Sequence, residues 1–319
     1  MKTRFLKLSI LLVFGLTFVN LSYSQKSNRS TTTTSLTVTY EYAERSLPLI
    51  VALEKGFFSK YGVNINPRKL KGESLNLQEV DIVNGYWLSF FEGEGINPTI
   101  MKFIHPFAMK KDGDMINGLL VKKSAGINSW KDFKAKTLVV PVEWLYYDVL
   151  KQVFELHGVD TRIGFEGISS LKVGGVAGFT NVKGGDALFS WAEEIKKLQE
   201  QNPNAYVLFA RNLQSEYIVD PYFEGCTYIN MVSFRKDSES FYKYINAIDE
   251  AIDFIREHPK DALAGIPKYF DSTLEEATRM GIYHFYKSQE LPPWEAFRKV
   301  VDKNLEGFFF SSTKGEKDE

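Results

Sequence analysis

The segment 52–65, ALEKGFFSKYGVNI, constrains the fold of this chain more than any other. It follows an alternating apolar run at 36–40 by little more than the length of a helix. Gly56 and Gly62 each end a run of structure, so the order predicts a strand, a loop, an amphipathic helix at 47–58, a tight turn and a second strand at 63–66. A strand–helix–strand opening of this kind is typical of α/β folds.

The rest of the chain continues this alternation. Strands are predicted at 81–83, 98–104, 115–122, 137–142, 184–189, 205–210 and 225–234, and helices at 146–156, 238–257, 259–269, 273–286 and 293–308. Ser129 and Asp132 have the spacing of a capping box, and Gly158 predicts a further turn. Alternating strands and helices favour parallel-rich sheets, in which ligands bind at the carboxyl ends of strands.

The N-terminus predicts export. Lys2, Arg4 and Lys7 precede an apolar run at 8–19, and small residues lie before a cleavage site at Gln25. The run is shorter than the ~20 residues that span a bilayer, so 1–24 is predicted to be a cleaved signal peptide, with an uncleaved membrane anchor as the alternative. No cysteine lies near that site, which excludes lipid attachment there. We therefore expect a periplasmic or otherwise extracytoplasmic protein.

Length and charge narrow the class further. The polar segment 25–35 is predicted to be a disordered linker and 312–319 a disordered tail. The residues between them exceed the size at which single cores usually stop growing, so two lobes are expected. The chain has 39 basic and 40 acidic residues, and loss of the signal peptide leaves it mildly acidic. The absence of a basic stripe argues against a nucleic-acid partner.

Three motifs resemble one known family. Segment 52–63 resembles the "A-x-E-x-G-F-F-x-x-x-G-(I/V/L)" signature of periplasmic (type II) ABC-transporter substrate-binding proteins of the sulfonate, nitrate and thiamine-pyrimidine-precursor branch. Segment 129–140, SWKDFKAKTLVV, resembles the motif "s-l-x-D-L-k-G-K-k-v-g-v" that opens the second lobe, although Ala135 replaces its glycine. Segment 184–189, GGDALF, resembles the "G-x-v-D-A" element.

The resemblance implies a two-lobed type II periplasmic-binding-protein fold of the α/β class. Each lobe would be a mixed, mostly parallel sheet flanked by helices, with a ligand cleft between the lobes. Lobe 1 is predicted at 36–123 and 222–311, and lobe 2 at 124–221. The protein would be a monomer that closes about hinges near Lys123 and Asp220-Pro221 and delivers a small molecule to an ABC permease in the inner membrane.

Aromatic and charged residues follow the predicted strands. The candidate ligand-binding residues are Tyr40, Glu41, Tyr42, Glu44, Arg45, Gly85, Tyr86, Trp87, Glu143, Trp144, Tyr146, Phe189 and Trp191. Flat rings bind flat ligands by offset stacking, although such rings also fill interfaces between lobes and helices. We expect one shell shared by both lobes, formed by Tyr42 and Trp87 with Trp144 and Trp191.

The pair Glu143-Trp144 indicates the ligand chemistry. Anion-binding members of the family place small hydroxyl residues and glycine there, so that backbone N–H groups face the oxyanion. A carboxylate and an indole would instead repel sulfonate or nitrate. A planar, neutral or cationic heteroaromatic ligand fits better, such as a pyrimidine-type vitamin precursor or a flavin.

Motifs of catalysis and cofactor binding are absent from the sequence. The histidines are scattered without metal-ligand spacing, and neither a nucleophile elbow nor a phosphate loop occurs. We therefore expect no catalytic residues, no metal and no cofactor, and Cys226 reads as a buried strand residue. Two alternatives stay open. One is an enzyme on the same fold, of the pyrimidine-precursor-synthesis or menaquinone-pathway dehydratase type, and the other is a ligand-sensing surface protein.

Overall fold

The computed structural model describes residues 35–70, 79–86, 101–134, 136–140, 145–159, 176, 179–180, 185–290 and 296. The predicted signal peptide, the linker up to residue 34, the tail and most of the predicted helix at 293–308 lie outside these residues. Within them, no helix combines the length and the apolar character needed to cross a membrane.

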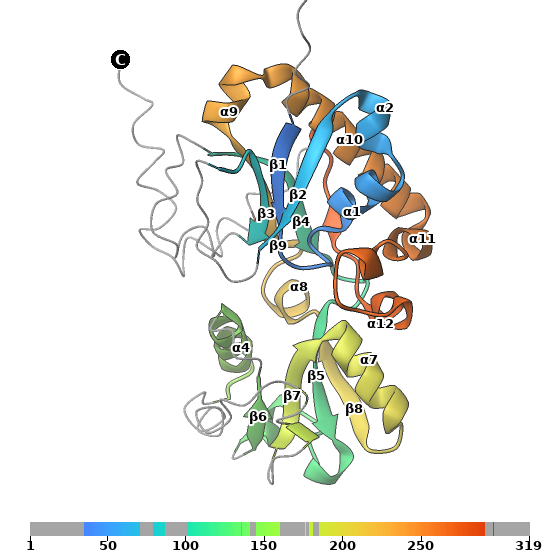
Figure 1. The fold of residues 1–319 in the computed structure, drawn as a ribbon. Coiled ribbons are helices and arrows are strands. Elements are labelled where there is room, and N and C mark those ends of the chain that lie inside the picture. The colour runs from blue at the N-terminus through green and yellow to red at the C-terminus, as the bar shows by residue number, and fades with distance from the viewer. Residues whose placement is uncertain are drawn as a thin grey trace, which may run out of the picture. The chain divides into compact units, whose positions relative to one another are not determined.

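Six strands form the larger sheet, in the order β10-β4-β9-β3-β1-β2 (Figure 1). Their bounds are β1 Ser35–Tyr40, β2 Asn64–Lys69, β3 Ile82–Tyr86, β4 Met101–Met109, β9 Tyr222–Asn230 and β10 His284–Phe285. Strand β1 runs parallel to β2 and β3, whereas β9 runs antiparallel to β3 and β4, and β10 runs antiparallel to β4.

Four strands form the smaller sheet, in the order β6-β7-β5-β8. Their bounds are β5 Asn117–Lys122, β6 Thr137–Val139, β7 Gly185–Trp191 and β8 Tyr206–Arg211. Strands β6 and β7 are parallel, whereas β5 is antiparallel to both β7 and β8. The predicted α/β fold with two mixed sheets is thereby confirmed, but the expectation of mostly parallel sheets is wrong for the described strands. The pairs β1–β2, β1–β3 and β6–β7 are parallel. The pairs β3–β9, β4–β9, β4–β10, β5–β7 and β5–β8 are antiparallel, and four of these five involve β5 or β9, which follow the passages between the sheets.

Helices cover both sheets. With the larger sheet lie α1 Leu47–Glu54, α2 Phe57–Tyr61, α9 Met231–Lys236, α10 Ser238–Glu257, α11 Pro259–Leu263 and α12 Leu274–Arg279, and with the smaller sheet lie α4 Leu145–Leu156, α7 Ala192–Gln201 and α8 Leu213–Tyr217. Helix α10 packs against α1 and α2. Its buried side chains recur with helical spacing, so one face of the helix enters the core.

The opening segment has the predicted order with one refinement. The helix predicted at 47–58 is two helices, because Gly56 adopts a left-handed conformation with φ 70° and separates α1 from α2. Gly62, with φ 69°, ends α2 before β2 begins. Glycine reaches this conformation without the steric cost that a Cβ atom imposes, so both positions act as the sequence predicts.

The predicted capping box at Ser129 is present. It begins a short 3₁₀ helix, Trp130–Phe133, in which the backbone N–H of Ser129 donates to the Asp132 carboxylate at 2.8 Å. The backbone N–H groups of Asn128 and Ser129 both donate to this carboxylate, and these two hydrogen bonds are the main cause of the lowered pKa of Asp132.

Several predicted elements are shorter than expected. The helix predicted at 259–269 ends at Leu263 as α11, and a separate 3₁₀ helix at Ile266–Lys268 follows. The helix predicted at 273–286 ends at Arg279, and the chain then continues into β10. A Cβ atom on Gly281 would lie 2.0 Å from the Met115 carbonyl oxygen, so this segment is held against the chain that links the sheets. The strand predicted to reach residue 234 ends at Asn230, whose side chain accepts from the Val232 N–H and begins α9.

Each sheet has its own core. One cluster gathers around β1, α1 and α10, and two more lie on the two faces of the smaller sheet. Side chains along β7 alternate between those faces, with Phe189 in one cluster and Leu188 in the other. Trp191 is partly buried and packs against both the first cluster and the Phe189 cluster.

The chain passes between the sheets at 110–116 and at 218–221. The second passage includes Asp220-Pro221, as the sequence predicts. The first lies before the predicted site, because β5 already belongs to the smaller sheet and Lys123 follows it in the 3₁₀ helix Lys123–Ala125. The exact lobe limits stay a prediction.

A buried polar network links the end of the first passage to the start of α8, which precedes the second passage. The Ile116 N–H donates to Asn212 Oδ1 at 2.7 Å, and Asn117 Nδ2 donates to Gln214 Oε1 at 3.0 Å. Gln214 Nε2 in turn lies 3.3 Å from Glu224 Oε1 in β9. Hydrogen bonds offset the cost of burying these side chains, so the residues next to the passages are well ordered.

Candidate functional site

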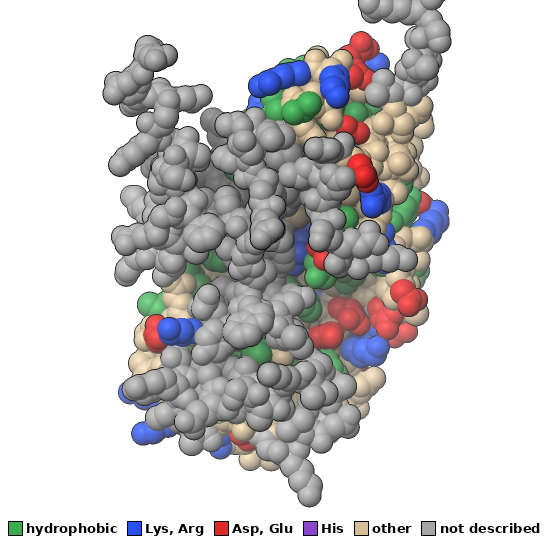
Figure 2. Space-filling view, turned by 60° about the vertical axis from the view of Figure 1, so that its left-hand side comes forward, with side chains coloured by type: hydrophobic (Ala, Val, Ile, Leu, Met, Phe, Trp, Pro, Cys, Tyr) green, Lys and Arg blue, Asp and Glu red, His purple; other side chains and the backbone are tan. Residues whose placement is uncertain are grey.

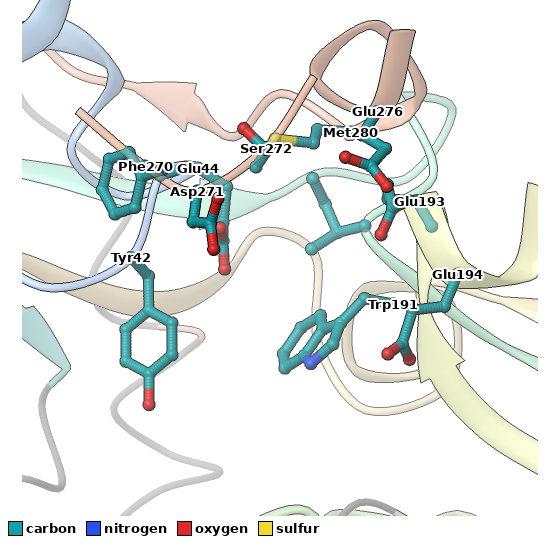
Figure 3. A pocket seen from close by; sticks show the side chains of 14 residues that line it. Tyr42, Glu44, Trp191, Glu193, Glu194, Phe270, Asp271, Ser272, Glu276 and Met280 are labelled. Carbon is teal, nitrogen blue, oxygen red and sulfur yellow. The ribbon is translucent and has the colours of Figure 1, made fainter. Parts of the chain in front are cut away.

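A cavity of about 370 Å³ is lined by four segments that lie far apart in the sequence (Figure 3). They are the loop after β1, the residue before β5, the junction of β7 with α7, and the segment that leads into and past α12. The lining residues are Tyr42, Ala43, Glu44, Ile116, Trp191, Ala192, Glu193, Glu194, Phe270, Asp271, Ser272, Glu276, Met280 and Gly281. The cavity thus draws side chains from elements of both sheets.

The loop after β1 supplies Tyr42 and Glu44. Its turn is closed by the Ser46 N–H, which donates to the Tyr42 carbonyl at 3.0 Å. The neighbouring Arg45 is 4% exposed, and its guanidinium carbon lies 4.3 Å from the centroid of the Tyr42 ring. Arg45 therefore supports one face of Tyr42 from inside the protein, by a cation–π contact, and is not a surface residue.

The β7–α7 junction supplies Trp191, Glu193 and Glu194. Trp191 pairs with Asn117 in the sheet, which fixes the backbone from which its indole enters the cavity. Helix α7 begins at the next residue with two glutamates in its first turn, where negative charge is favoured by the helix dipole. Burial raises the pKa of Glu193, and the charges of Glu194 and Glu276 raise it further against the influence of Lys197.

The α12 segment supplies Phe270, Asp271 and Glu276. Thr273 and Glu276 form a capping box, in which the Thr273 N–H donates to the Glu276 carboxylate at 2.8 Å. These bonds, together with Lys197, lower the pKa of Glu276 to about 2. The capping box therefore fixes an ionised carboxylate at the cavity wall.

Two ion pairs join α12 to α7 beside the cavity. Lys197 Nζ lies 3.0 Å from Glu276 Oε1, and Arg279 Nε lies 2.7 Å from Glu200 Oε2. Exposed pairs of this kind contribute roughly 0–1 kcal/mol, so they orient the two helices more than they stabilise them. Figure 2 shows acidic side chains with few basic ones among them at mid-height on the right, the height at which α7 and α12 lie in Figure 1.

Three of the predicted site residues meet in this cavity, namely Tyr42, Glu44 and Trp191. In Figure 3 Tyr42 lies on one side, and the indole of Trp191 extends toward it from the other. Tyr42 and Trp191, two of the four residues expected to form one shell, therefore line the same cavity. Whether these residues bind ligand stays a prediction.

Other predicted site residues lie elsewhere. Tyr40 is 8% exposed, and its ring packs against Phe270 at a centroid distance of 5.6 Å. Phe189 is fully buried because β7 alternation directs it into a core, and Gly85 lies within β3 opposite Cys226. Glu41 and Arg45 are not among the residues that line the cavity. None of these five residues is among the described residues that line the cavity.

The remaining predicted residues cannot be placed fully. Trp87, Glu143 and Trp144 lie outside the described residues. Tyr86 ends β3 and Tyr146 lies in α4, but their side chains are outside the described part of the structure. The predicted roles of Glu143 and Trp144 in ligand choice are therefore still predictions.

Sequence reasoning missed the contribution of the C-terminal segment. Phe270, Asp271 and Glu276 lie more than two hundred residues from Tyr42, and no local pattern links them. The T-x-x-E spacing of Thr273 and Glu276 predicts a helix start, but it says nothing about a cavity. Helix α7 is not among the predicted helices, so Glu193 and Glu194 in its first turn were not expected beside a cavity either.

The chemistry of the cavity is that of aromatic rings and carboxylates. Among the described residues, no group of three or more histidine, cysteine, aspartate or glutamate side chains has the geometry to hold a metal ion. Cys226 is fully buried, and burial raises the pKa of its thiol. The aromatic rings can stack on a flat ligand, and the carboxylates can accept hydrogen bonds from it or pair with a positive charge on it.

Searches of protein-family models and of curated proteins find no match. Solved structures match over most of the chain. The periplasmic aliphatic sulphonate-binding protein SsuA from Escherichia coli has a TM-score of 0.58 at 13% identity, over 79% of this chain and 85% of that chain. The periplasmic nitrate-binding protein NrtA from Synechocystis PCC 6803 has a TM-score of 0.56 at 14% identity, over 89% and 84%. The desulfurization enzyme DSZB has a TM-score of 0.56 at 14% identity, over 85% and 92%.

At these identities the likeness concerns the fold. Two of these proteins bind sulphonate and nitrate, the ligands of the branch that the sequence motifs resemble, and the third is an enzyme. The fold expected from that resemblance is confirmed: this chain has the periplasmic-binding-protein fold.

Proposed function

We propose that this protein is an extracytoplasmic solute-binding protein that encloses a small planar ligand between its lobes. The observation that carries the proposal is one cavity with Tyr42 from the loop after β1 and Trp191 from the end of β7 in its lining. A ligand between these rings contacts elements of both sheets at once. It therefore binds the closed arrangement better than an open one, which is the condition for ligand-driven closure.

The cavity size suits this role. A volume of about 370 Å³ lies within the range of small-molecule pockets, which run from roughly 300 to 1,000 Å³. The passages at 110–116 and 218–221 are the hinge candidates, and buried hydrogen bonds between Ile116 and Asn212 and between Asn117 and Gln214 fix the chain next to them. Delivery to an ABC permease follows by analogy with binding proteins of this fold, and the predicted signal peptide supports a location outside the cytoplasm.

An enzyme is the second candidate, because DSZB is an enzyme with this fold. Among the described lining residues, Glu193 is a candidate general base, since its pKa is raised by burial. We favour binding because the described lining residues include no thiol or imidazole that could act as a nucleophile. A ligand-sensing surface protein would use the same closed state, and a neighbouring permease gene pair would distinguish transport from sensing.

A thermal-shift and titration screen tests the proposal. The purified protein is exposed to pyrimidines, flavins, sulfonates, nitrate and amino acids, and native-state binding raises the melting temperature by mass action. We expect a planar heterocycle to stabilise the wild type, and the stabilisation to be lost in Tyr42→Ala and Trp191→Leu. Tyr242→Ala is the matched control, because this tyrosine is 58% exposed and lies outside the cavity lining.

Two outcomes contradict the proposal. Stabilisation by a ligand that is unchanged in both cavity variants places the site elsewhere. Conversion of a bound compound into product, with turnover lost on Glu193→Gln, favours the enzyme.

A further inference from the structure

The cavity wall has an excess of negative charge. Five of its lining residues are acidic, and the described lining contains no lysine or arginine. The acidic residues are Glu44, Glu193, Glu194, Asp271 and Glu276. In Figure 3 Glu44 and Asp271 lie on the side of Tyr42, and Glu193 and Glu276 lie on the side of Trp191. A ligand between the rings therefore meets carboxylates on both sides.

The protein itself compensates only part of this charge. Glu276 is paired with Lys197 and held in its capping box, and Glu194 accepts a hydrogen bond from the Ser190 hydroxyl. Glu44, Glu193 and Asp271 form no ion pair with a side chain in the described part of the structure. Burial already disfavours ionisation of Glu193, so a positive charge next to it would be stabilising.

The helix N-terminus at the cavity is closed to anions. Proteins that bind oxyanions use the N–H groups and the dipole of a helix start. Helix α7 starts at the cavity wall, but Glu193 and Glu194 occupy its first turn with their own negative charge. An anion placed there would face two carboxylates at close range, which is unfavourable.

Aromatic rings complete the site. Trp191 and Phe270 line the cavity, and the quadrupole of an aromatic ring attracts a cation placed over its face. Tyr42 already has the Arg45 guanidinium over one face, so Trp191 is the ring best able to receive a ligand cation. Rings and uncompensated carboxylates together are the means by which proteins bind cationic organic ligands.

We propose that the cavity takes a small planar ligand that bears a positive charge, such as a protonated aminoheterocycle or a quaternary heteroaromatic amine, and rejects anions. The inference rests on the proposed binding function and adds the charge class of its ligand. Trp191 stacks on the ring of the ligand, Glu44 and Glu193 face its positive charge, and Glu276 stays paired with Lys197.

A matched series of probes tests the charge class by titration calorimetry. 1-Methylnicotinamide is a cation, nicotinamide is neutral and nicotinate is an anion, and all three present a similar flat ring. We expect the cation to bind at least about tenfold more tightly than the neutral probe, and the anion to show no binding. Because the attraction is electrostatic, an increase in salt from about 0.05 to about 0.5 M should lower the affinity for the cation and leave the affinity for the neutral probe unchanged.

Variants assign the effect to the cavity. Glu193→Gln and Glu44→Gln are expected to lower the affinity for 1-methylnicotinamide about fivefold or more and to leave the affinity for nicotinamide unchanged. Glu239→Gln is the control, because it removes the same charge from an exposed position on α10, where Glu239 pairs with Lys243. Equal losses in Glu193→Gln and Glu239→Gln would show a general charge effect and overturn the assignment.

The outcomes separate this inference from the proposed function. Equal or tighter binding of nicotinate overturns the charge class, as does the failure of all three probes at millimolar concentration. If a neutral or anionic planar compound from the broader screen binds and needs Tyr42 and Trp191, the binding function stands and the inference fails. If no compound in either set binds, the binding function fails as well.

Discussion

Gly225 should tolerate no side chain, because the centre of the larger sheet has no room for one. A Cβ atom built on Gly225 would lie 2.1 Å from the carbonyl oxygen of Gly85 and 2.8 Å from the ring of Phe107. Real Cβ contacts essentially never fall below 3.0 Å, so Gly225→Ala must move the β3 backbone by nearly 1 Å. Glycine at 85 was predicted as a site residue, and this contact gives its carbonyl a structural role.

The cost can be worked out from these distances. Overpacking a core costs about 1–3 kcal/mol. Displacing β3 from β9 also weakens ladder hydrogen bonds worth about 1 kcal/mol each, and the pair Gly85–Cys226 lies in that ladder. Alanine offsets about 0.5–1 kcal/mol of this loss, because it lowers the conformational entropy of the unfolded chain relative to glycine. If two such bonds are weakened, we expect the free energy of unfolding to fall by about 2–4 kcal/mol, a large share of the ~5–15 kcal/mol typical of a folded protein.

Urea unfolding followed by circular dichroism measures this change, and a thermal scan should show a fall in melting temperature of about 4–16 °C. Gly185→Ala is the matched control. That glycine is also buried in a strand, but its nearest neighbour would lie 3.3 Å away, so we expect a change within about 1 kcal/mol. If Gly225→Ala costs no more than Gly185→Ala, the steric reasoning is wrong.

Three further changes test other parts of the structure. Burial raises the pKa of Glu224 to about 8, above its unfolded value near 4.5, so its contribution to stability is complete below pH 4.5 and is lost as pH rises to 8. Between pH 4.5 and 8 the unfolding free energy of the wild type should fall by about 1.4 kcal/mol per pH unit relative to that of Glu224→Gln, as measured by urea titrations. Equal pH dependence of the two unfolding free energies would contradict this. The Cys226 thiol should resist a disulfide reagent in the native protein and react on unfolding, and rapid native labelling would refute its burial. Trp130 stacks on His157 with ring centroids 4.4 Å apart, so Trp130→Ala should lower the unfolding free energy by about 3 kcal/mol, whereas the exposed Tyr242→Ala should change it little.

Local signals in the sequence predicted most elements of the fold. Gly62 and Gly158 end helices where expected, and each has a positive φ that glycine reaches without strain. The bounds of α10 match the predicted helix at 238–257, because an acidic cap and a long amphipathic pattern fix both ends. These features depend on neighbours within one or two turns, which a sequence pattern contains.

Side-chain direction was harder to predict. Phe189 and Trp191 lie two residues apart on β7, yet the former is in a core and the latter also lines the cavity. Alternation predicts that they share a face, but only the end of the strand, where the smaller sheet meets the core around α10, leaves the ring of Trp191 partly open.

The sequence by itself determined the class of fold, the export signal that we expect at the N-terminus, and aromatic loops at the ends of β1 and β7. Only the tertiary structure decided which of those rings share a cavity and what charge surrounds them. Asp271 and Glu276 reach the same cavity as Tyr42 because the C-terminal segment returns to the passage between the sheets, where Gly281 contacts Met115. Contacts between such distant segments depend on the packing of whole helices and sheets, and no local pattern of residues encodes them.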